Sequence, residues 1–138
     1  MTRKSYTSHD PIKNYFPMPN EIFSLGLSTG EIAVYAYLMY CEDRRSFQCH
    51  PSYTTIGNAV GMTPKTVSKY VQMLEQKGLI STEPTTVTLK DGRKHNGNLL
   101  YTICPIQPVI EQRFQQQMFQ ARTEAALQAY DRKHPTSR

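Results

Sequence analysis

The stretch that decides the fold is residues 49–80, CHPSYTTIGNAVGMTPKTVSKYVQMLEQKGLI, which indicates two short helices joined by a tight turn. In its second half, Thr63 offers a side-chain oxygen to the first backbone N–H groups of a helix, and Pro64 suits the first helical position. Apolar side chains then recur along one helical face, at Val67, Tyr70, Val71 and Leu74. Gly78 is placed to end this helix in a left-handed conformation.

The opposite face of this second helix carries small hydroxyls, an amide and two cations. Such groups can reach base edges and phosphates when a helix lies in the major groove of DNA. The predicted groove contacts are Thr63, Lys65, Thr66, Ser68, Lys69 and Gln72. Gln72 could pair bidentately with adenine, and Lys65 or Lys69 with guanine.

The first helix of the pair is predicted over about residues 52–60, opened by Pro51 and capped by His50 or Ser52. Gly61 supplies the permissive backbone of the turn between the helices. The predicted inward side comprises Ile56 with Ala59 or Val60. The start of this helix is predicted to accept a DNA phosphate through Ser52, Tyr53 and Thr54.

Upstream, residues 28–31 have the spacing of a capping box, with Ser28 as the cap and Glu31 three residues later. The helix that follows is apolar almost all round, which predicts a buried central element. Prolines interrupt residues 14–27, so we expect an extended segment and then one helical turn over residues 20–24, capped by Asn20. The side chains expected to cover the core are Tyr15, Phe16, Ile22, Phe23, Leu25 and Leu27.

Downstream, residues 79–89 alternate as a strand does, although Pro84 indicates an edge or a bulge. Residues 90–97, KDGRKHNG, predict a turn, and residues 98–104 a return strand, with a short strand over 47–49 at its edge. Helices followed by a basic hairpin have the layout of a winged helix. The predicted wing-tip contacts to phosphates or the minor groove are Lys90, Arg93, Lys94, His95 and Asn96. A solvated basic turn is the alternative.

After Pro105 and Pro108, the glutamine-rich residues 109–133 predict a long amphipathic helix. Its apolar stripe is Ile110, Phe114, Met118, Ala121 and Ala125. This helix would either fold back on the domain or pair with a second copy of the chain. We therefore expect a mainly α fold with a small β-hairpin wing. Its predicted parts are a flexible arm (1–13), a winged helix-turn-helix domain (14–104), and a C-terminal amphipathic helix with a frayed tail (105–138).

The composition suits a polyanionic partner, since the 138 residues carry a formal charge of +5 and the pI is about 9.2. No signal peptide and no long apolar run are visible, so we expect a cytoplasmic protein that spans no membrane. Cys41, Cys49-His50 and Cys104 lack zinc spacing and suggest buried free thiols rather than a metal site. The chain has no GxxxxGK[ST] phosphate loop and no HExxH motif, so we expect neither an enzyme nor a cofactor.

Residues 15–104 resemble the helix-turn-helix domain of replication initiator protein A type proteins, which occur on bacterial plasmids, phages and integrated mobile elements. The resemblance is carried by FPMPNEIFSLGL, STGEIAVYAYLMY and PSYTTIGNAVGMTPKTVSKYVQMLEQKGLI. Its most specific parts are Pro51-Ser52, Gly61-x-Thr63, Thr66-Val67 and the Leu74…Gly78-Leu79-Ile80 exit. It implies a winged helix that binds duplex DNA, with residues 63–72 as the reading helix and 90–96 as the wing. Family initiators often carry a further C-terminal domain, whereas here a glutamine-rich helix follows Cys104.

Three functions are compatible with these patterns. The first is a replication initiator or replication-control protein of a mobile element that binds duplex DNA. The second is a small transcriptional repressor that forms a homodimer through residues 109–133. The third, of another class, is a winged-helix module that binds proteins and has no role on DNA.

Overall fold

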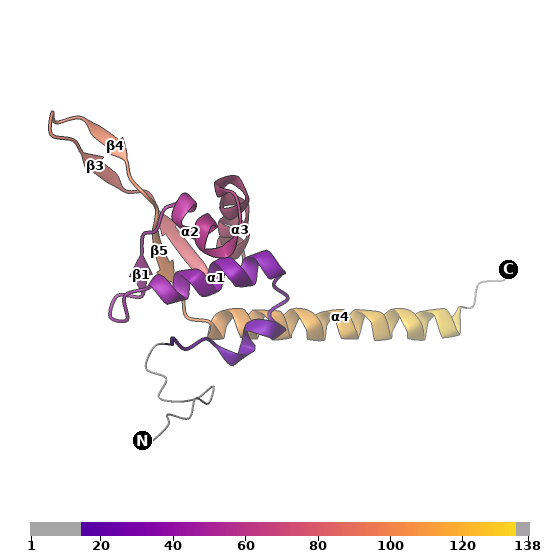
Figure 1. Ribbon diagram of the computed structural model, residues 1–138. Coiled ribbons are helices and arrows are strands. Elements are labelled where there is room, and N and C mark those ends of the chain that lie inside the picture. Colours follow the sequence, from indigo (N-terminus) through magenta and orange to yellow (C-terminus); the bar gives the residue numbers. More distant parts are fainter. Residues whose placement is uncertain (1–14, 135–138) are drawn as a thin grey trace, which may run out of the picture.

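The computed structural model describes residues 15–134, so the predicted arm over 1–13 and the last four residues lie outside the part described here (Figure 1). The order of elements is η1 (Asn20–Ser24), α1 (Thr29–Cys41), β1 (Gln48–Cys49), α2 (Tyr53–Val60), α3 (Pro64–Gln76), β2 (Ile80–Glu83), β3 (Thr86–Thr88), β4 (Lys94–Asn96), β5 (Leu100–Ile103) and α4 (Gln107–Lys133). This is the expected fold, a winged helix-turn-helix followed by a long C-terminal helix.

Side-chain caps set the starts of the first three α-helices. Ser28 and Glu31 form the predicted capping box of α1: Ser28 Oγ accepts the Glu31 N–H (3.3 Å), and Glu31 Oε1 accepts the Ser28 N–H (2.9 Å). Ser52 caps α2, which decides between the two predicted candidates, and Thr63 caps α3. The predicted Asn20 cap is wrong, because the 3-10 helix η1 is capped one residue earlier, at Pro19, whose carbonyl accepts the Ile22 N–H.

The core is built around α1, as predicted. Its buried apolar residues are Ile22, Leu25, Val34, Tyr35, Leu38, Met39, Cys49, Ile56, Val67, Val71, Leu74, Leu79, Ile80 and Tyr101. Two predicted core residues are wrong: Tyr15 is 70% exposed and Phe23 is 80% exposed. The single turn of η1 turns Ile22 and Leu25 inward and leaves Phe23 outside. In α2, Ile56 and Gly57 are buried, and the second predicted inward residue is Val60, which packs half-buried against the core, whereas Ala59 is exposed.

The strands form two small sheets. The first has the antiparallel order β1-β5-β2, with Gln48 opposite Thr102 and Ile80 opposite Ile103, and it confirms the short edge strand expected before α2. The strand pattern predicted over 79–89 breaks after β2, at Pro84, and resumes as β3, which pairs with β4. The predicted turn over 90–97 is therefore too long: β4 takes up residues 94–96, so His95 and Asn96 lie on a strand and not at the tip.

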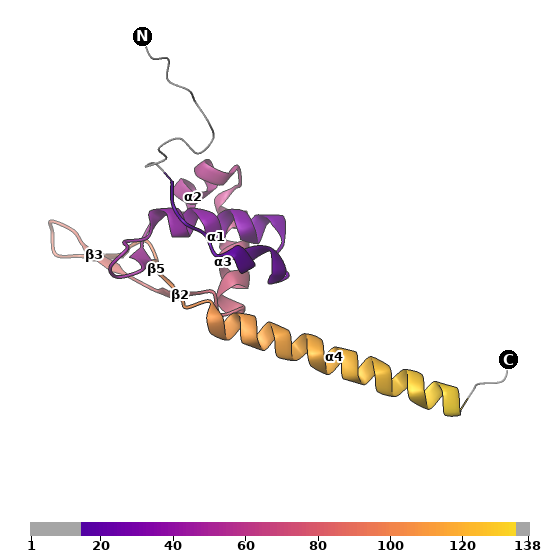
Figure 2. The same ribbon diagram turned by 90° about the horizontal axis from the view of Figure 1, so that it is seen from below.

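Helix α4 projects away from the domain, in a different direction from the β3–β4 hairpin (Figures 1 and 2). Only its first turns touch the core, where Val109 and Ile110 are half-buried. No residue of α4 is buried, so the first of the two predicted alternatives, folding back on the domain, does not hold. Its exposed large apolar side chains are Phe114, Met118, Phe119, Leu127 and Tyr130. Since these occupy more than one side, α4 is less amphipathic than predicted.

Candidate nucleic-acid interface

Two glycines shape the turn that joins α2 to α3. Gly61 ends α2 in a left-handed conformation (φ 78°), and its N–H donates to the Gly57 carbonyl at 2.8 Å. A Cβ on Gly57 would lie 2.3 Å from the Met62 carbonyl oxygen, so a side chain there would force the turn apart. Sequence reasoning predicted the role of Gly61 and missed Gly57, because the need for a bare Cα comes from backbone contact and leaves no local signal.

Helix α3 is held firmly by its apolar face. Val67, Val71 and Leu74 are at most 1% exposed. Tyr70, also on this face, packs directly on Gly30 of α1, where a Cβ would lie 2.2 Å from the tyrosine ring. The opposite face of α3 is therefore turned outward in a single orientation.

The outward face of α3 carries the side chains predicted to contact DNA. Of these, Thr63, Lys65, Lys69 and Gln72 are exposed, and Thr66 and Ser68 are half-buried. The hydroxyls of Thr63 and Thr66 lie 3.0 Å apart within the helix cap. The Gln72 amide lies 3.5 Å from Ser68 Oγ, and Lys69 Nζ lies 5.3 Å from the centroid of the Tyr70 ring. Lys65, Lys69 and Gln72 are thus exposed, and the contacts of Lys69 and Gln72 are weak enough to exchange for a ligand.

The three residues at the start of α2 that were predicted to bind a phosphate differ in which of their groups are free to do so. Ser52 Oγ accepts the Thr55 N–H (3.0 Å) and donates to Thr55 Oγ1 (2.9 Å), so its hydroxyl is used by the cap. The Tyr53 ring is half-buried against the core. The N–H groups of Tyr53 and Thr54 belong to the first turn, where no intrahelical acceptor exists, and they suit an anion.

The wing is the exposed two-stranded ribbon β3–β4 with its turn over 89–93. Arg93 Nε lies 2.7 Å from Asp91 Oδ2, so one of the predicted wing cations is already paired. Lys90 and Lys94 form no ion pair within residues 15–134. At the base, Asn98 Nδ2 donates to the His50 carbonyl at 3.2 Å. This bond joins the wing to the loop that leads into α2.

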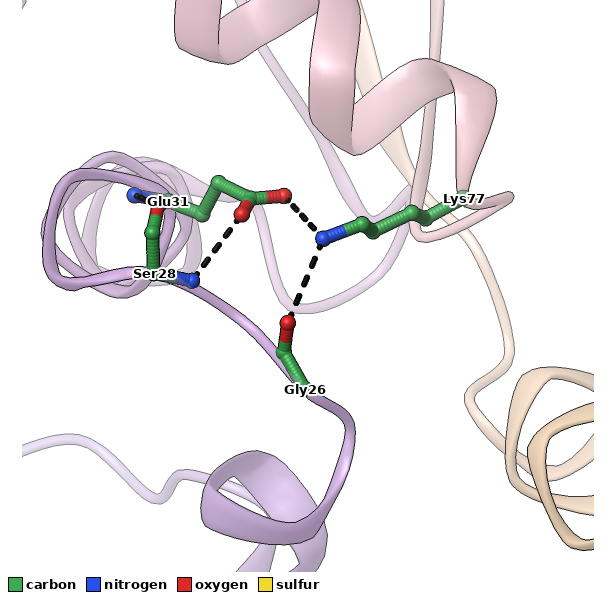
Figure 3. Close-up of polar contacts among 4 residues, drawn as sticks. All are labelled: Gly26, Ser28, Glu31 and Lys77. Atoms are coloured by element: carbon green, nitrogen blue, oxygen red, sulfur yellow. Dashed lines mark hydrogen bonds and ion pairs between the residues drawn. The ribbon is translucent and has the colours of Figure 1, made fainter. Parts of the chain in front are cut away.

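An ion pair between a buried carboxylate and a partly exposed lysine ties the end of α3 to the start of α1 (Figure 3). Lys77 Nζ lies 2.7 Å from Glu31 Oε2 and donates to the Gly26 carbonyl at 3.4 Å, while the Glu31 side chain is 1% exposed. Burial alone would raise the pKa of Glu31, but the Lys77 ammonium and the Ser28 N–H and hydroxyl outweigh it and hold that pKa below its ordinary value. Lys77 is thus committed to the domain, and sequence reasoning found only the Ser28 half of this network.

One catalytic motif needs the structure to be interpreted. Residues 26–30, GLSTG, match the G-x-S-x-G pattern of a serine nucleophile, which requires a strand, a sharp turn and then a helix. Here the segment follows the 3-10 helix η1 instead of a strand, and Ser28 Oγ accepts the Glu31 N–H as a helix cap. The pattern is therefore structural in this chain.

The cysteines differ in their surroundings. Cys49 is buried and donates to the Leu38 carbonyl at 3.5 Å, and burial raises its pKa to about 12. Cys41 and Cys104 are half-buried, less enclosed than predicted. In the described part of the chain, no group of three or more His, Cys, Asp or Glu side chains could hold a metal ion. None of the helices described there is both long and apolar enough to cross a membrane.

Comparison with known proteins identifies the central unit. Residues 25–80 match the family described as "Helix-turn-helix domain". No curated protein matches the chain. A similar solved structure is a possible transcriptional regulator from Methanosarcina mazei Go1, which is 17% identical, with a TM-score of 0.53 over 75% of this chain and 81% of that one. At this identity the likeness shows the fold alone, and neither match confirms the replication initiator protein A type. Residues 25–80 are therefore similar in sequence to helix-turn-helix domains, and the fold of the chain is that of a winged helix.

Proposed function

We propose that this protein binds duplex DNA sequence-specifically and regulates transcription as a homodimer. The observation that carries the DNA-binding proposal is the two-sidedness of α3. Three of its apolar side chains are at most 1% exposed, while Lys65, Lys69 and Gln72 stand on its exposed side. A helix fixed in this way can present the same side chains to every DNA site.

In the proposed complex, α3 lies in the major groove. Gln72 would pair with adenine, and Lys65 or Lys69 with guanine, each good pair supplying roughly 1–3 kcal/mol of discrimination. The N–H groups of Tyr53 and Thr54 would bind one phosphate. Lys90 and Lys94 of the wing would bind others, with Arg93 contributing less because Asp91 already pairs with it. Phosphate contacts set register and make the affinity depend on salt.

The homodimer proposal rests on α4. Its 27 residues extend for about 40 Å, and its exposed apolar side chains include Phe114 (60% exposed) and Phe119 (70% exposed). Large apolar side chains in such numbers on a projecting helix favour an interaction surface. A second copy of the same chain would cover the apolar stripe on each α4 helix and place two α3 helices on one duplex.

Replication control of a mobile element is the second candidate, supported by the sequence resemblance over residues 15–104. It uses the same DNA interface at repeated origin sites. A protein-interaction module, the alternative of another class, is disfavoured by the cations on α3 and the wing.

Selection of bound duplexes from a random pool tests these roles together. A dimeric regulator predicts an inverted repeat with half-sites about one helical turn apart, roughly 34–36 Å. Direct repeats would instead support replication control. No binding to any duplex, even at low salt, would contradict a role on DNA.

Light scattering of the full chain tests the homodimer. We expect the mass of two chains, and the mass of one chain when Phe114→Glu and Met118→Glu place charges on the stripe. The matched control carries Gln116→Glu and Gln120→Glu on the other side of α4 and should remain dimeric. A full chain that is monomeric at the concentrations used for DNA binding would contradict the proposal.

A further inference from the structure

A cavity of about 570 Å³ opens where four segments meet: the proline-containing segment 17–19, the end of α1, the loop before β1, and the junction of β5 with α4. Its volume lies within the range of small-molecule sites. None of the side chains proposed to contact DNA lines it. The helix-turn-helix function therefore leaves this cavity without a role.

The walls of the cavity are mainly apolar. They include two aromatic rings, two thioethers and two branched aliphatic side chains, from Met18, Tyr35, Met39, Phe47, Ile103 and Ile106. Aromatic and thioether groups of this kind suit the flat or aliphatic body of a small organic molecule.

The polar group that gives the cavity its chemistry is Glu42, at the end of α1. Its Oε2 atom is buried and accepts no hydrogen bond from residues 15–134. Burial raises the pKa of Glu42, against the opposing effect of the nearby Arg44 guanidinium. An unsatisfied carboxylate oxygen beside an apolar cavity is suited to a ligand that donates hydrogen bonds and carries positive charge.

Phe47 supplies an independent observation. Its φ of 59° is left-handed, which is uncommon and unfavourable for a bulky residue. The conformation is held by its N–H, which donates to the Asp43 carbonyl (2.7 Å), and by its carbonyl, which accepts the Ile103 N–H (2.9 Å). The ring is nevertheless 53% exposed, so core packing does not account for it. Strained backbone conformations of this kind cluster at active sites and ligand clamps.

We propose that this cavity binds a small aromatic or aliphatic amine. The apolar body of the ligand would lie between Phe47, Met39 and Ile106, and its ammonium group would donate to the Glu42 carboxylate. Arg44, at the exposed rim, disfavours a second positive charge, so a monoamine fits best. This inference goes beyond the proposed function, since it needs neither DNA nor a second chain.

The test uses the full chain with ¹³C-labelled methionine methyl groups and phenethylamine as the probe. We expect saturable shifts of the Met18 and Met39 methyl signals, with Met62 and Met118 unmoved. The matched acid, 3-phenylpropionate, has nearly the same body without the amine and should bind at least about tenfold more weakly. Unmoved Met18 and Met39 signals, or equal affinity for the amine and the acid, would overturn the proposal.

Two variants complete the test. Glu42→Gln should weaken phenethylamine binding by about tenfold, because the charge is lost while the shape is kept. Its control, Glu83→Gln on β2, lies away from the cavity and should bind as the unmodified chain does. Ile106→Phe narrows the cavity without touching Glu42 and should also weaken binding. Unchanged affinity in both Glu42→Gln and Ile106→Phe would refute the site.

Discussion

Helices α3 and α4 are built in opposite ways. The 13-residue α3 is closed at both ends, by the Thr63 cap and by the left-handed Gly78, beyond which the Leu79 N–H returns to the Leu74 carbonyl at 3.1 Å. The 27-residue α4 has Ile106 as its N-cap, without a side-chain cap bond, and buries none of its residues. Packing in the domain fixes the position of α3, whereas α4 extends beyond the domain.

This difference separates two kinds of surface. In α3 the core takes one face and leaves the other in a fixed orientation, so its polar side chains can be specialised for a rigid partner such as DNA. Beyond the first turns of α4, nothing in the domain selects a face, and only an external partner can bury Phe114 or Phe119. Matched substitutions in α3 and α4 test how complete this separation is.

Truncation of a leucine in each helix should give the largest difference between α3 and α4 in the free energy of unfolding. Leu74→Ala removes a fully buried side chain of α3 and should lower the free energy of unfolding by about 2–5 kcal/mol. Leu127→Ala in α4, where the side chain is 58% exposed, should change it by less than about 0.5 kcal/mol. Urea denaturation of both variants measures this. Similar losses would show that α4 is covered in the folded protein.

Glu31→Gln breaks the ion pair at the end of α3 and should lower the free energy of unfolding by about 2 kcal/mol. This loss is below the usual range for a buried pair because Lys77 is 35% exposed. The pKa of Glu31 is lowered by folding, so its contribution is complete above the unfolded pKa of about 4.3 and is lost as the pH falls through the folded value. The difference in unfolding free energy between the two proteins should therefore shrink in acid.

Unfolding measured from neutral pH into acid checks this, with Glu124→Gln on the exposed α4 as the control. The control should follow the unmodified chain at every pH. A Glu31→Gln difference that does not vary with pH would contradict the assignment of the Lys77 pair.

Removal of one side-chain hydrogen bond from each helix should give the smallest difference in the free energy of unfolding. Thr63→Ala removes the oxygen that accepts the Thr66 N–H and should cost about 1 kcal/mol, whereas Thr63→Ser should be nearly neutral. In α4, Thr123→Ala removes a bond to the Phe119 carbonyl within an exposed helix and should stay within about 0.5 kcal/mol. Thermal unfolding of the three variants measures the contrast. An equal loss for Thr63→Ala and Thr123→Ala would contradict it.

Most of the domain could be predicted because its signals are local. The Ser28 box, the Thr63-Pro64 start and the Gly78 stop each satisfy backbone groups within a few residues, so the sequence reveals them. The wrong or missing predictions concern residues whose surroundings are set by segments distant in the sequence. Phe23 is exposed because η1 is a single turn, and Gly57 must lack a side chain because the Met62 carbonyl approaches it.

In the candidate interface, too, some features follow from the sequence and others only from the folded structure. The polar side of α3 follows from helical periodicity, and the structure places all of its predicted residues in one region. Arg93 is paired with Asp91 and Lys77 with Glu31, so both cations already have an acidic partner within the domain, and only the folded geometry reveals the second pair. The direction of α4 was also beyond the sequence, because an apolar stripe does not specify which surface will cover it.

The proposed contact of α3 with base edges can be tested by measuring the affinity of variants for the selected duplex and for a random one. Lys65→Ala or Lys69→Ala should weaken binding to the selected duplex by about 1–3 kcal/mol and weaken binding to the random duplex less. Lys94→Ala on the wing should weaken binding to both duplexes similarly and reduce the salt slope by about one. Equal effects of all three variants on both duplexes would contradict the account.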